Sequence, residues 1–319
     1  MDGFDGAEGN DGFPGSRPAL KEGTDHLPVR LWGLLAALTL VWGLNWVAMK
    51  LALAEVPPWT FRSLCLALGS AVLFLALHLG GQKIPWPRGQ WARLWMLALL
   101  NITGWNILVA YGLTMIPSGR ASTLAFTMPA LAIPLSVWLL GERLTVPKAV
   151  GLALGLAGLA LLLGEAYSAI GAAPLGSLLV LGAAMSWALG TVLQKKYPVA
   201  MAAGPYTAWS MFLGGVPIYI GAVLVEDPRV LADVGARAWF GTAYNVFLAF
   251  AFGNWAWIKL ATSVSVTVFS LSILVIPAVA VVGGVVFLGE QPGLAEIAAL
   301  VLVLGSLATV VMPARAAAK

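Results

Sequence analysis

Charged residues are scarce in this chain. Asp, Glu, Lys and Arg together make up 10% of its 319 residues, whereas 60% are hydrophobic. An ordinary soluble domain has roughly 25% charged residues, so this composition excludes one. A helix needs about 20 consecutive, mostly apolar residues to cross the ~30 Å hydrocarbon core of a bilayer. The chain is rich in such runs, so its composition predicts an all-α integral membrane protein.

Cysteine and histidine are scarcer still. The chain has one cysteine, Cys65, and two histidines. A single cysteine can form no intrachain disulfide and no cysteine metal cluster. The sequence also has no HExxH and no GxSxG motif, so it lacks the metal ligands and the activated nucleophile that an intramembrane enzyme needs. We expect no enzyme activity, no metal and no cofactor.

Acidic residues are missing from the middle of the apolar runs. After residue 30, every Asp and Glu falls in a connection or at the end of a run: Glu55, Glu142, Glu165, Glu226, Asp227, Asp233, Glu290 and Glu296. No carboxylate is therefore placed as the membrane-embedded proton relay that coupled pumps use. Proton coupling and facilitated diffusion both stay open.

The apolar runs number ten, and the connections between them are short. The runs are residues 31–52, 59–79, 94–114, 121–140, 146–163, 174–194, 203–225, 238–259, 264–288 and 292–312. We predict ten transmembrane helices with no room for a soluble domain. Residues 1–28 are rich in Gly, Pro and Asp and predict a disordered tail, because they lack both a hydrophobic pattern and the features of a signal peptide. Residues 313–319 form a short second tail.

The basic residues are distributed unequally between the two sides of the predicted membrane. Of 18 Lys and Arg, 13 lie on the side of the N-terminal segment, and five lie on the other: Lys50, Arg62, Arg120, Arg229 and Arg237. Positively charged connections stay in the cytoplasm. Both termini are therefore predicted to be cytoplasmic, as an even number of spans requires. The net charge of +4 is scattered over helix ends, so we expect no nucleic-acid partner.

Two halves of the chain share sequence features. Trp42-Gly43 with Lys50 recurs as Trp187-Ala188 with Lys195, and Pro129-Ala130 followed by a GER turn recurs as Pro277-Ala278 followed by a GEQ turn. Each half holds five predicted helices. Since five is odd, the second half must enter the membrane from the opposite face. Inverted repeats of this kind enclose a central cavity and expose it alternately to the two sides.

These features resemble the drug/metabolite transporter superfamily, and in particular its EamA-type repeat. The first repeat would cover residues 31–163 and the second, inverted repeat residues 174–312. Within that family the chain most resembles the YddG-type aromatic amino acid exporters of bacterial inner membranes. The resemblance implies a central cavity lined by the first four helices of each half. It also implies export of amino acids with aromatic or other apolar side chains, or of related metabolites, across the bacterial cytoplasmic membrane.

The first predicted helix carries polar and aromatic residues on one face. Trp42, Asn45, Trp46 and Met49 are spaced i, i+3, i+4 and i+7, near the middle of the bilayer. Tryptophan favours the membrane interface, and an amide in hydrocarbon needs a hydrogen-bond partner. These residues either line a cavity, where indoles stack on the substrate and the amide orients it, or pack at a helix interface with Asn45 bonded to a neighbour.

The same combination of amides and aromatic rings occurs in two further predicted helices. The candidate substrate-binding residues there are Asn101, Trp105 and Tyr111 in the third helix, and Tyr244, Asn254 and Trp257 in the eighth. A wall of aromatic rings and amides with few charges suits a zwitterion that has an apolar side chain. Arg120 and Lys259 at helix ends either extend to water or hold a substrate carboxylate at the mouth of the cavity.

Glycines, glutamates and prolines mark the expected turns and hinges. Glu142 and Glu290 follow glycines at the start of the last helix of each half, and we interpret both as structural. Pro129 and Pro277 are predicted to kink the fourth and ninth helices and to act in gating. The spacing of Gly151 and Gly155 permits close helix packing, either within the chain or between two copies.

Two alternatives to amino acid export remain at this point. An exporter of lipophilic drugs with broad specificity would also use aromatic walls, and a membrane scaffold or receptor would not transport at all. A sugar-phosphate carrier is disfavoured because cations are missing from the middle of the runs. The expected partners are a small-molecule substrate and the lipid bilayer, with weak homo-oligomerisation left open.

Overall fold

The computed structural model describes residues 29–168, 173–263 and 266–311. Every regular element in these ranges is helical. The first half of the chain forms α1 (Val29–Ala52), α2 (Pro58–Leu79), α3 (Trp91–Ala98), the π-helix η1 (Leu99–Gly104), α4 (Trp105–Met115), α5 (Ser118–Ala125), α6 (Met128–Leu140) and α7 (Val146–Ser168).

The second half follows a similar order, with a 3-10 helix added and the single helix α12 where the first half has α5 and α6. It forms α8 (Ala173–Lys196), α9 (Ala203–Val225), the short 3-10 helix η2 (Pro228–Ala232), α10 (Ala236–Ala243), the π-helix η3 (Tyr244–Phe252), α11 (Gly253–Ser263), α12 (Val266–Leu288) and α13 (Leu294–Val311). The third predicted helix is thus α3, η1 and α4 in succession, and the eighth is α10, η3 and α11. In each of them a π-segment interrupts the α-helix near its middle.

Seven helical stretches in the described ranges are long and apolar enough to cross a membrane. They are Val29–Ala52, Pro58–Leu79, Trp91–Met115, Ser118–Leu140, Val146–Gly164, Pro174–Lys196 and Ala203–Val225. Two further apolar helical stretches, Val275–Leu288 and Leu294–Thr309, are shorter. This pattern confirms an all-helical membrane protein with several spans.

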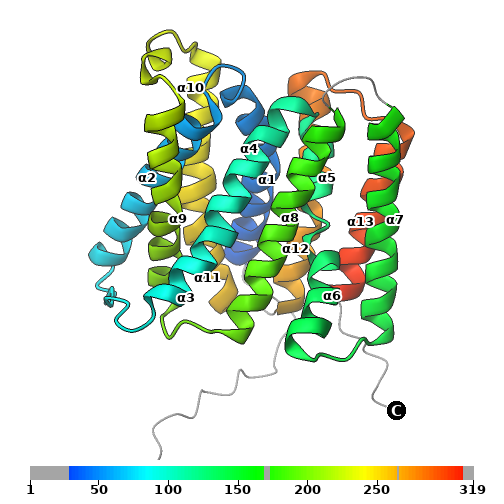
Figure 1. Cartoon of the computed structure of the whole chain (residues 1–319), viewed down its shortest axis with the longest axis horizontal. Coiled ribbons are helices and arrows are strands. Elements are labelled where there is room, and N and C mark those ends of the chain that lie inside the picture. Colours follow the sequence, from blue (N-terminus) through cyan, green and yellow to red (C-terminus); the bar gives the residue numbers. More distant parts are fainter. Residues whose placement is uncertain (1–28, 169–172, 264–265, 312–319) are drawn as a thin grey trace, which may run out of the picture.

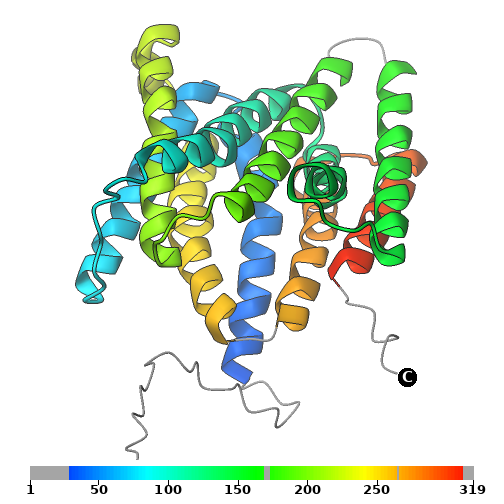
Figure 2. The ribbon, with the colours of Figure 1, turned by 60° about the horizontal axis from the view of Figure 1, so that its bottom comes forward.

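The helices form one bundle with α1 near its centre (Figures 1 and 2). α2, α9 and the α10–η3–α11 rod lie on one side of α1, whereas α7 and α13 form a separate pair on the other. α1 and α8 run in opposite directions through the bundle, and the connections α6–α7 and α12–α13 lie at opposite ends (Figure 1). The beginning of α1 and the end of α13 lie toward the same end (Figure 2).

The two final helices, α7 and α13, pack through small residues. The Ser306 hydroxyl donates a hydrogen bond of 2.6 Å to the Gly151 carbonyl, and a methyl group added at Gly155 would collide with Ala130. Gly158 lies against Val303. The glycine spacing noted in the sequence therefore serves packing within the chain.

The fourth predicted helix is divided into α5 and α6, so Pro129 does not lie in a helix interior. The chain leaves helical geometry between α5 and α6, and Pro129 occupies the first turn of α6. Proline is tolerated there because the first N–H groups of a helix have no partner within it. The proline inside α6 is Pro134, whereas Pro277 lies inside α12 as predicted.

Gly141 and Gly289 end α6 and α12 in the left-handed conformation, each with φ of 67°. Glycine adopts this conformation without the steric cost that a Cβ atom imposes. The two turns expected from the sequence therefore have the same geometry in both halves.

Candidate functional site

Two asparagine side chains donate hydrogen bonds to backbone carbonyls where the π-segments end. The Asn106 side chain donates from Nδ2 to the Ile102 carbonyl at 2.8 Å, and Asn254 donates to the Phe250 carbonyl at 2.7 Å. The wider π-turn takes backbone carbonyls out of the i to i−4 pattern, so a side-chain amide can satisfy one of them. The two bonds lie 148 positions apart, the same offset that relates the GER and GEQ turns.

Each π-segment is completed by the first helix of the other half. The indole nitrogen of Trp42 in α1 donates to the Ala249 carbonyl in η3 at 3.1 Å. The Ser186 hydroxyl in α8 donates to the Leu100 carbonyl in η1 at 2.7 Å. Glycines make room for both: a methyl group at Gly253 would collide with the Trp42 indole, and one at Gly104 would collide with Ser186.

The candidate tryptophans gather in the centre of the bundle. Trp46 is buried there, and Trp42 and Trp105 pack against the same core. The ring centroids of Trp42 and Trp257 are 5.2 Å apart, and those of Trp105 and Trp187 are 5.1 Å apart. Trp187, noted in the sequence only as the repeat partner of Trp42, thus joins the aromatic group.

Both candidate tyrosines use their hydroxyls in contacts between helices. The Tyr111 hydroxyl accepts a hydrogen bond of 2.9 Å from the Trp59 indole of α2. The Tyr244 hydroxyl donates to the Val41 carbonyl of α1 at 3.0 Å. Tyr244 therefore helps to fix α1 against η3.

Three asparagine side chains keep a buried carbonyl oxygen without a hydrogen-bond donor: Asn45, Asn101 and Asn245. Asn101 lies against Gly190 of α8, and Asn245 is fully buried. A buried polar atom without a partner costs about 1–3 kcal/mol, so native proteins keep few of them. Asn245 is missing from the candidates drawn from the sequence, although it lies in the same aromatic and amide run as Tyr244 and Asn254.

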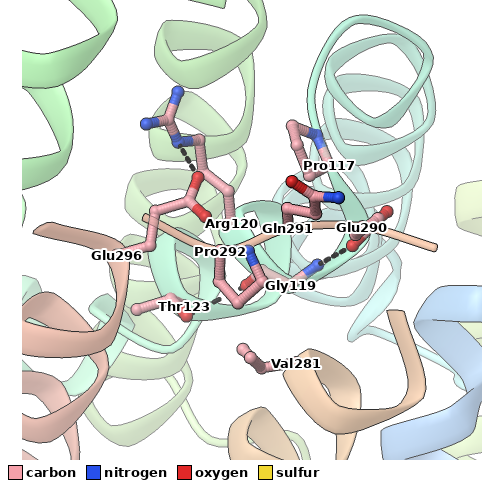
Figure 3. A pocket seen from close by; sticks show the side chains of 9 residues that line it. All are labelled: Pro117, Gly119, Arg120, Thr123, Val281, Glu290, Gln291, Pro292 and Glu296. Carbon is pink, nitrogen blue, oxygen red and sulfur yellow. Dashed lines mark hydrogen bonds and ion pairs between the residues drawn. The ribbon is translucent and has the colours of Figure 1, made fainter. Parts of the chain in front are cut away.

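Glu290 joins the two halves at one end of the bundle, next to a small cavity of about 20 Å³ (Figure 3). Its carboxylate accepts hydrogen bonds from the Ser118 amide at 2.6 Å, the Ser118 hydroxyl at 2.9 Å and the Gly119 amide at 3.2 Å. A carboxylate at the N-terminus of a helix complements its unpaired N–H groups and its dipole. Glu290 therefore caps α5 of the first half, not its own helix α13. We call these contacts the Glu290 clasp.

Arg120 forms a second link at the same end. Its Nε lies 2.7 Å from a carboxylate oxygen of Glu296 in the first turn of α13 (Figure 3). Both side chains are largely buried, with exposed fractions of 7% and 13%. The structure thus places Arg120 in an ion pair between the halves.

Two further cations near this end are held by the protein. The Lys50 ammonium donates to the carbonyls of Leu113 at 2.6 Å and Ile116 at 2.7 Å, where the C-terminus of α4 favours a positive charge. Arg62, counted in the sequence among the cations of this side, is buried in the first turns of α2 with its guanidinium 2.9 Å from the sulfur of Met49. Both bonds of Lys50 therefore lie within the bundle.

The opposite end carries the repeat counterparts of Glu290 and Lys50 in a different arrangement. Glu142 accepts hydrogen bonds from Lys148 at 2.7 Å and from Lys195. These bonds, Lys148 first, lower the pKa of Glu142 from 4.5 to about 2. At this end Lys195 bonds the glutamate of the other half directly, whereas Lys50 bonds carbonyls. Lys259, on α11, is exposed, and its ammonium lies 5.5 Å from the ring centre of Trp255.

A larger groove of about 320 Å³ opens between α1 and α12, and its lining is apolar: Leu40, Leu44, Ala278, Val279, Val282, Gly283, Val286 and Phe287. Neither this groove nor the small cavity at the Glu290 clasp contains the candidate aromatic and amide residues. In the described conformation Trp46 lies in the core, and Trp42 and Trp105 pack against the same core cluster.

An all-helical bundle with several apolar spans and matching contacts in its two halves defines a multi-pass membrane protein built by duplication. The EamA-like transporter family matches the chain twice, at residues 29–164 and 174–312. The chain belongs to this family, as the sequence resemblance predicted. It is therefore a membrane transporter by family.

Curated relatives include transporters from several bacteria. The "Uncharacterized transporter YvbV" of Bacillus subtilis is 31% identical over 282 residues, which cover 87% of this chain and 90% of that protein. "Uncharacterized transporter YoaV" of the same organism is 29% identical over 81% of this chain and 88% of its own. The "Probable amino-acid metabolite efflux pump" of Escherichia coli is 26% identical over 70% of this chain and 76% of its own.

A solved crystal structure of another protein has the same fold. It matches 91% of this chain and 98% of its own chain with a TM-score of 0.64 at 21% identity. At this level of identity the likeness shows the fold alone.

Proposed function

We propose that this protein exports amino acids with apolar side chains, or related small metabolites, across a bacterial cytoplasmic membrane by alternating access. The amino-acid substrate class is supported by the relative named as an amino-acid metabolite efflux pump and by the aromatic and amide residues at the centre of the bundle. We further propose ten spans arranged as two inverted halves, with both termini in the cytoplasm.

The exchange of equivalent contacts between the halves carries this proposal. α1 bonds the π-segment of the second half, and α8 bonds the π-segment of the first. A pseudo-twofold axis in the membrane plane generates such a pair of contacts from one ancestral contact. The opposite directions of α1 and α8 also support it (Figure 1). From that symmetry we expect two conformations in which the halves exchange roles and which have similar energies.

The ends of the bundle support a conformation closed at the Glu290 clasp. There, Glu290 and the Arg120–Glu296 ion pair link α5 to the α12–α13 region. At the other end Glu142 is engaged by lysines instead. We propose that the clasp breaks when the cavity opens toward this end, and that Pro277 lets α12 bend. Pro129, now in the first turn of α6, marks the break between α5 and α6 as a second hinge.

The proposed substrate wall keeps the candidates from the sequence: Trp42, Asn45, Trp46, Asn101, Trp105, Tyr111, Tyr244, Asn254 and Trp257. Their packing in the described conformation corresponds to a closed state, in which the indoles fill the space that the substrate takes. Arg120 can reach a substrate carboxylate only after its ion pair with Glu296 opens. Lys259, which is exposed on α11, stays the second predicted carboxylate contact.

Proteoliposomes test the proposed function directly. Purified protein should move radiolabelled phenylalanine or tryptophan down its gradient faster than protein-free vesicles do. A lipophilic cationic dye tests the alternative of a drug exporter, which the aromatic core also favours. Dye transport without amino acid transport would reverse the assignment. Movement of neither compound, nor of other amino acids and metabolites in a panel, would favour the scaffold or receptor class.

A further inference from the structure

The Asn245 side chain has one half of its amide fixed and the other half unpaired. Its nitrogen donates to the Gly241 carbonyl at 2.9 Å. Only the nitrogen of an amide can donate to a carbonyl, so this bond also fixes where the oxygen lies. That oxygen is buried without a donor, in a side chain whose exposed fraction is 0%.

The packing of α1 against the rod indicates where Asn45 lies relative to Asn245. Three contacts set the register: Gly241 packs on the backbone of Ala48 and Ala52, Tyr244 bonds Val41, and Ala249 accepts from Trp42. In α1, residues 41, 45, 48 and 52 share one helical face. In the rod, Asn245 is midway between Gly241 and Ala249. The register therefore places Asn45 and Asn245 at about the same level of this interface.

The oxygen of Asn45 is also buried without a donor. Hydroxyl groups nearby in sequence do not reach these oxygens, because Thr39 donates to Leu35 and Thr242 donates to Ala238 within their own helices. Within the described residues, both amide oxygens are therefore buried without a hydrogen-bond donor.

We propose that Asn45 and Asn245 form a subsite for the protonated amino group of the substrate. An ammonium group has N–H donors to satisfy both oxygens and no acceptor to repel them. A carboxylate or phosphate would face like partial charges in the same place. The subsite rests on the proposed function and narrows the substrate class to primary amines, amino acids included.

The test uses uptake of labelled phenylalanine into proteoliposomes. Phenethylamine, which keeps the amino group, should compete with phenylalanine, whereas 3-phenylpropanoate, which lacks it, should not. Asn45→Leu and Asn245→Leu should each raise the KM for phenylalanine about tenfold, the loss expected for a hydrogen bond to a charged group. They should also remove the discrimination between the two competitors.

Asn106→Leu is the matched control. It removes the same type of bond to an i−4 carbonyl beside the other π-segment, so it should keep the wild-type preference for the amine. Asn45→Asp keeps the shape of the side chain and adds a charge. It should bind phenethylamine more tightly than wild type, which a purely structural amide would not.

The outcomes separate the subsite from the function. Wild-type transport of phenylalanine with unchanged KM and unchanged competition in both leucine variants would overturn the subsite and leave the function standing. Failure of the wild type to move any amino acid would overturn the function. If a leucine variant does not fold, Asn45→Asp decides, because an unaltered affinity for phenethylamine in that folded variant contradicts the subsite.

Discussion

Gly253 leaves the space that one contact between the two halves needs. A methyl group there would collide with the indole nitrogen of Trp42, which bonds the Ala249 carbonyl. The sequence could not reveal this constraint, because the two residues are far apart in the chain and glycine is frequent in membrane helices. The candidate indoles were predictable from their unusual depth, but their partners were not.

Gly253→Ala should destabilise the protein by about 1–3 kcal/mol, the usual cost of overpacking a close contact. It should also lower transport, since Trp42 must move. Thermal unfolding in detergent measures the first effect and uptake the second. Gly182→Ala is the control, because a methyl group there meets Leu108 at an ordinary 3.5 Å. Equal melting temperatures for the two variants would contradict the close approach.

Glu142 provides a prediction for pH. Its pKa is lowered to about 2 in the folded protein from an ordinary 4.5, through bonds from Lys148 and Lys195. A depressed pKa adds stability above the ordinary pKa, and this stability is lost as the pH falls through the folded value. Stability should therefore drop between about pH 4.5 and pH 2. Glu142→Gln should weaken this dependence in thermal melts, and an identical pH profile in the variant would argue against the ion pairs.

At the scale of elements, the long apolar helices were predictable and their interruptions were not. Runs of apolar residues placed α1, α2, α7, α8 and α9 within a few residues of their true ends. The π-segments escaped notice because they keep an apolar composition while changing only the hydrogen-bond pattern. The break between α5 and α6 escaped for a similar reason, since no glycine or charge marks Phe126 or Thr127.

The two candidate hinge prolines should now behave differently. Pro277 lies inside α12 and denies a hydrogen bond to that helix, so Pro277→Ala should stiffen α12 and slow transport. Pro129 occupies the first turn of α6, where an N–H is unpaired in any case, so Pro129→Ala should change the stability and the transport rate less. Uptake rates of the two variants in matched vesicles give the comparison. Slower transport by the Pro129 variant than by the Pro277 variant would contradict a hinge in α12.

At the scale of the whole molecule, the family and the duplication were predictable from short matching motifs. The role of Glu290 was predictable only in part. The turn beside Gly289 indicated a structural carboxylate, and the expected partner was the nearest helix. Glu290 instead caps α5 of the other half, a contact that depends on how the halves dock.

The Glu290 clasp predicts a change in access at its end of the bundle. Thr123 is buried beside the cavity there. A cysteine introduced as Thr123→Cys should react slowly with a water-soluble thiol reagent in the otherwise native chain, and much faster after Glu290→Ala. The native Cys65 is fully buried, so the parent chain gives the background. Glu142→Ala is the control at the opposite end and should not speed labelling. Equal labelling rates with and without Glu290 would show that the clasp does not hold this end closed.

The reciprocal completion of the π-segments bears on how such a chain arose. The first helix of each half supplies a hydrogen-bond donor to the third helix of the other half. A single five-helix unit would therefore leave one backbone carbonyl of its third helix without that donor and the notch beside one glycine empty. An ancestral single unit would have needed a second copy of itself in the opposite orientation to fill the notch and bond the carbonyl. The two notches have since diverged, because Gly253 receives a bulky indole and Gly104 only a serine.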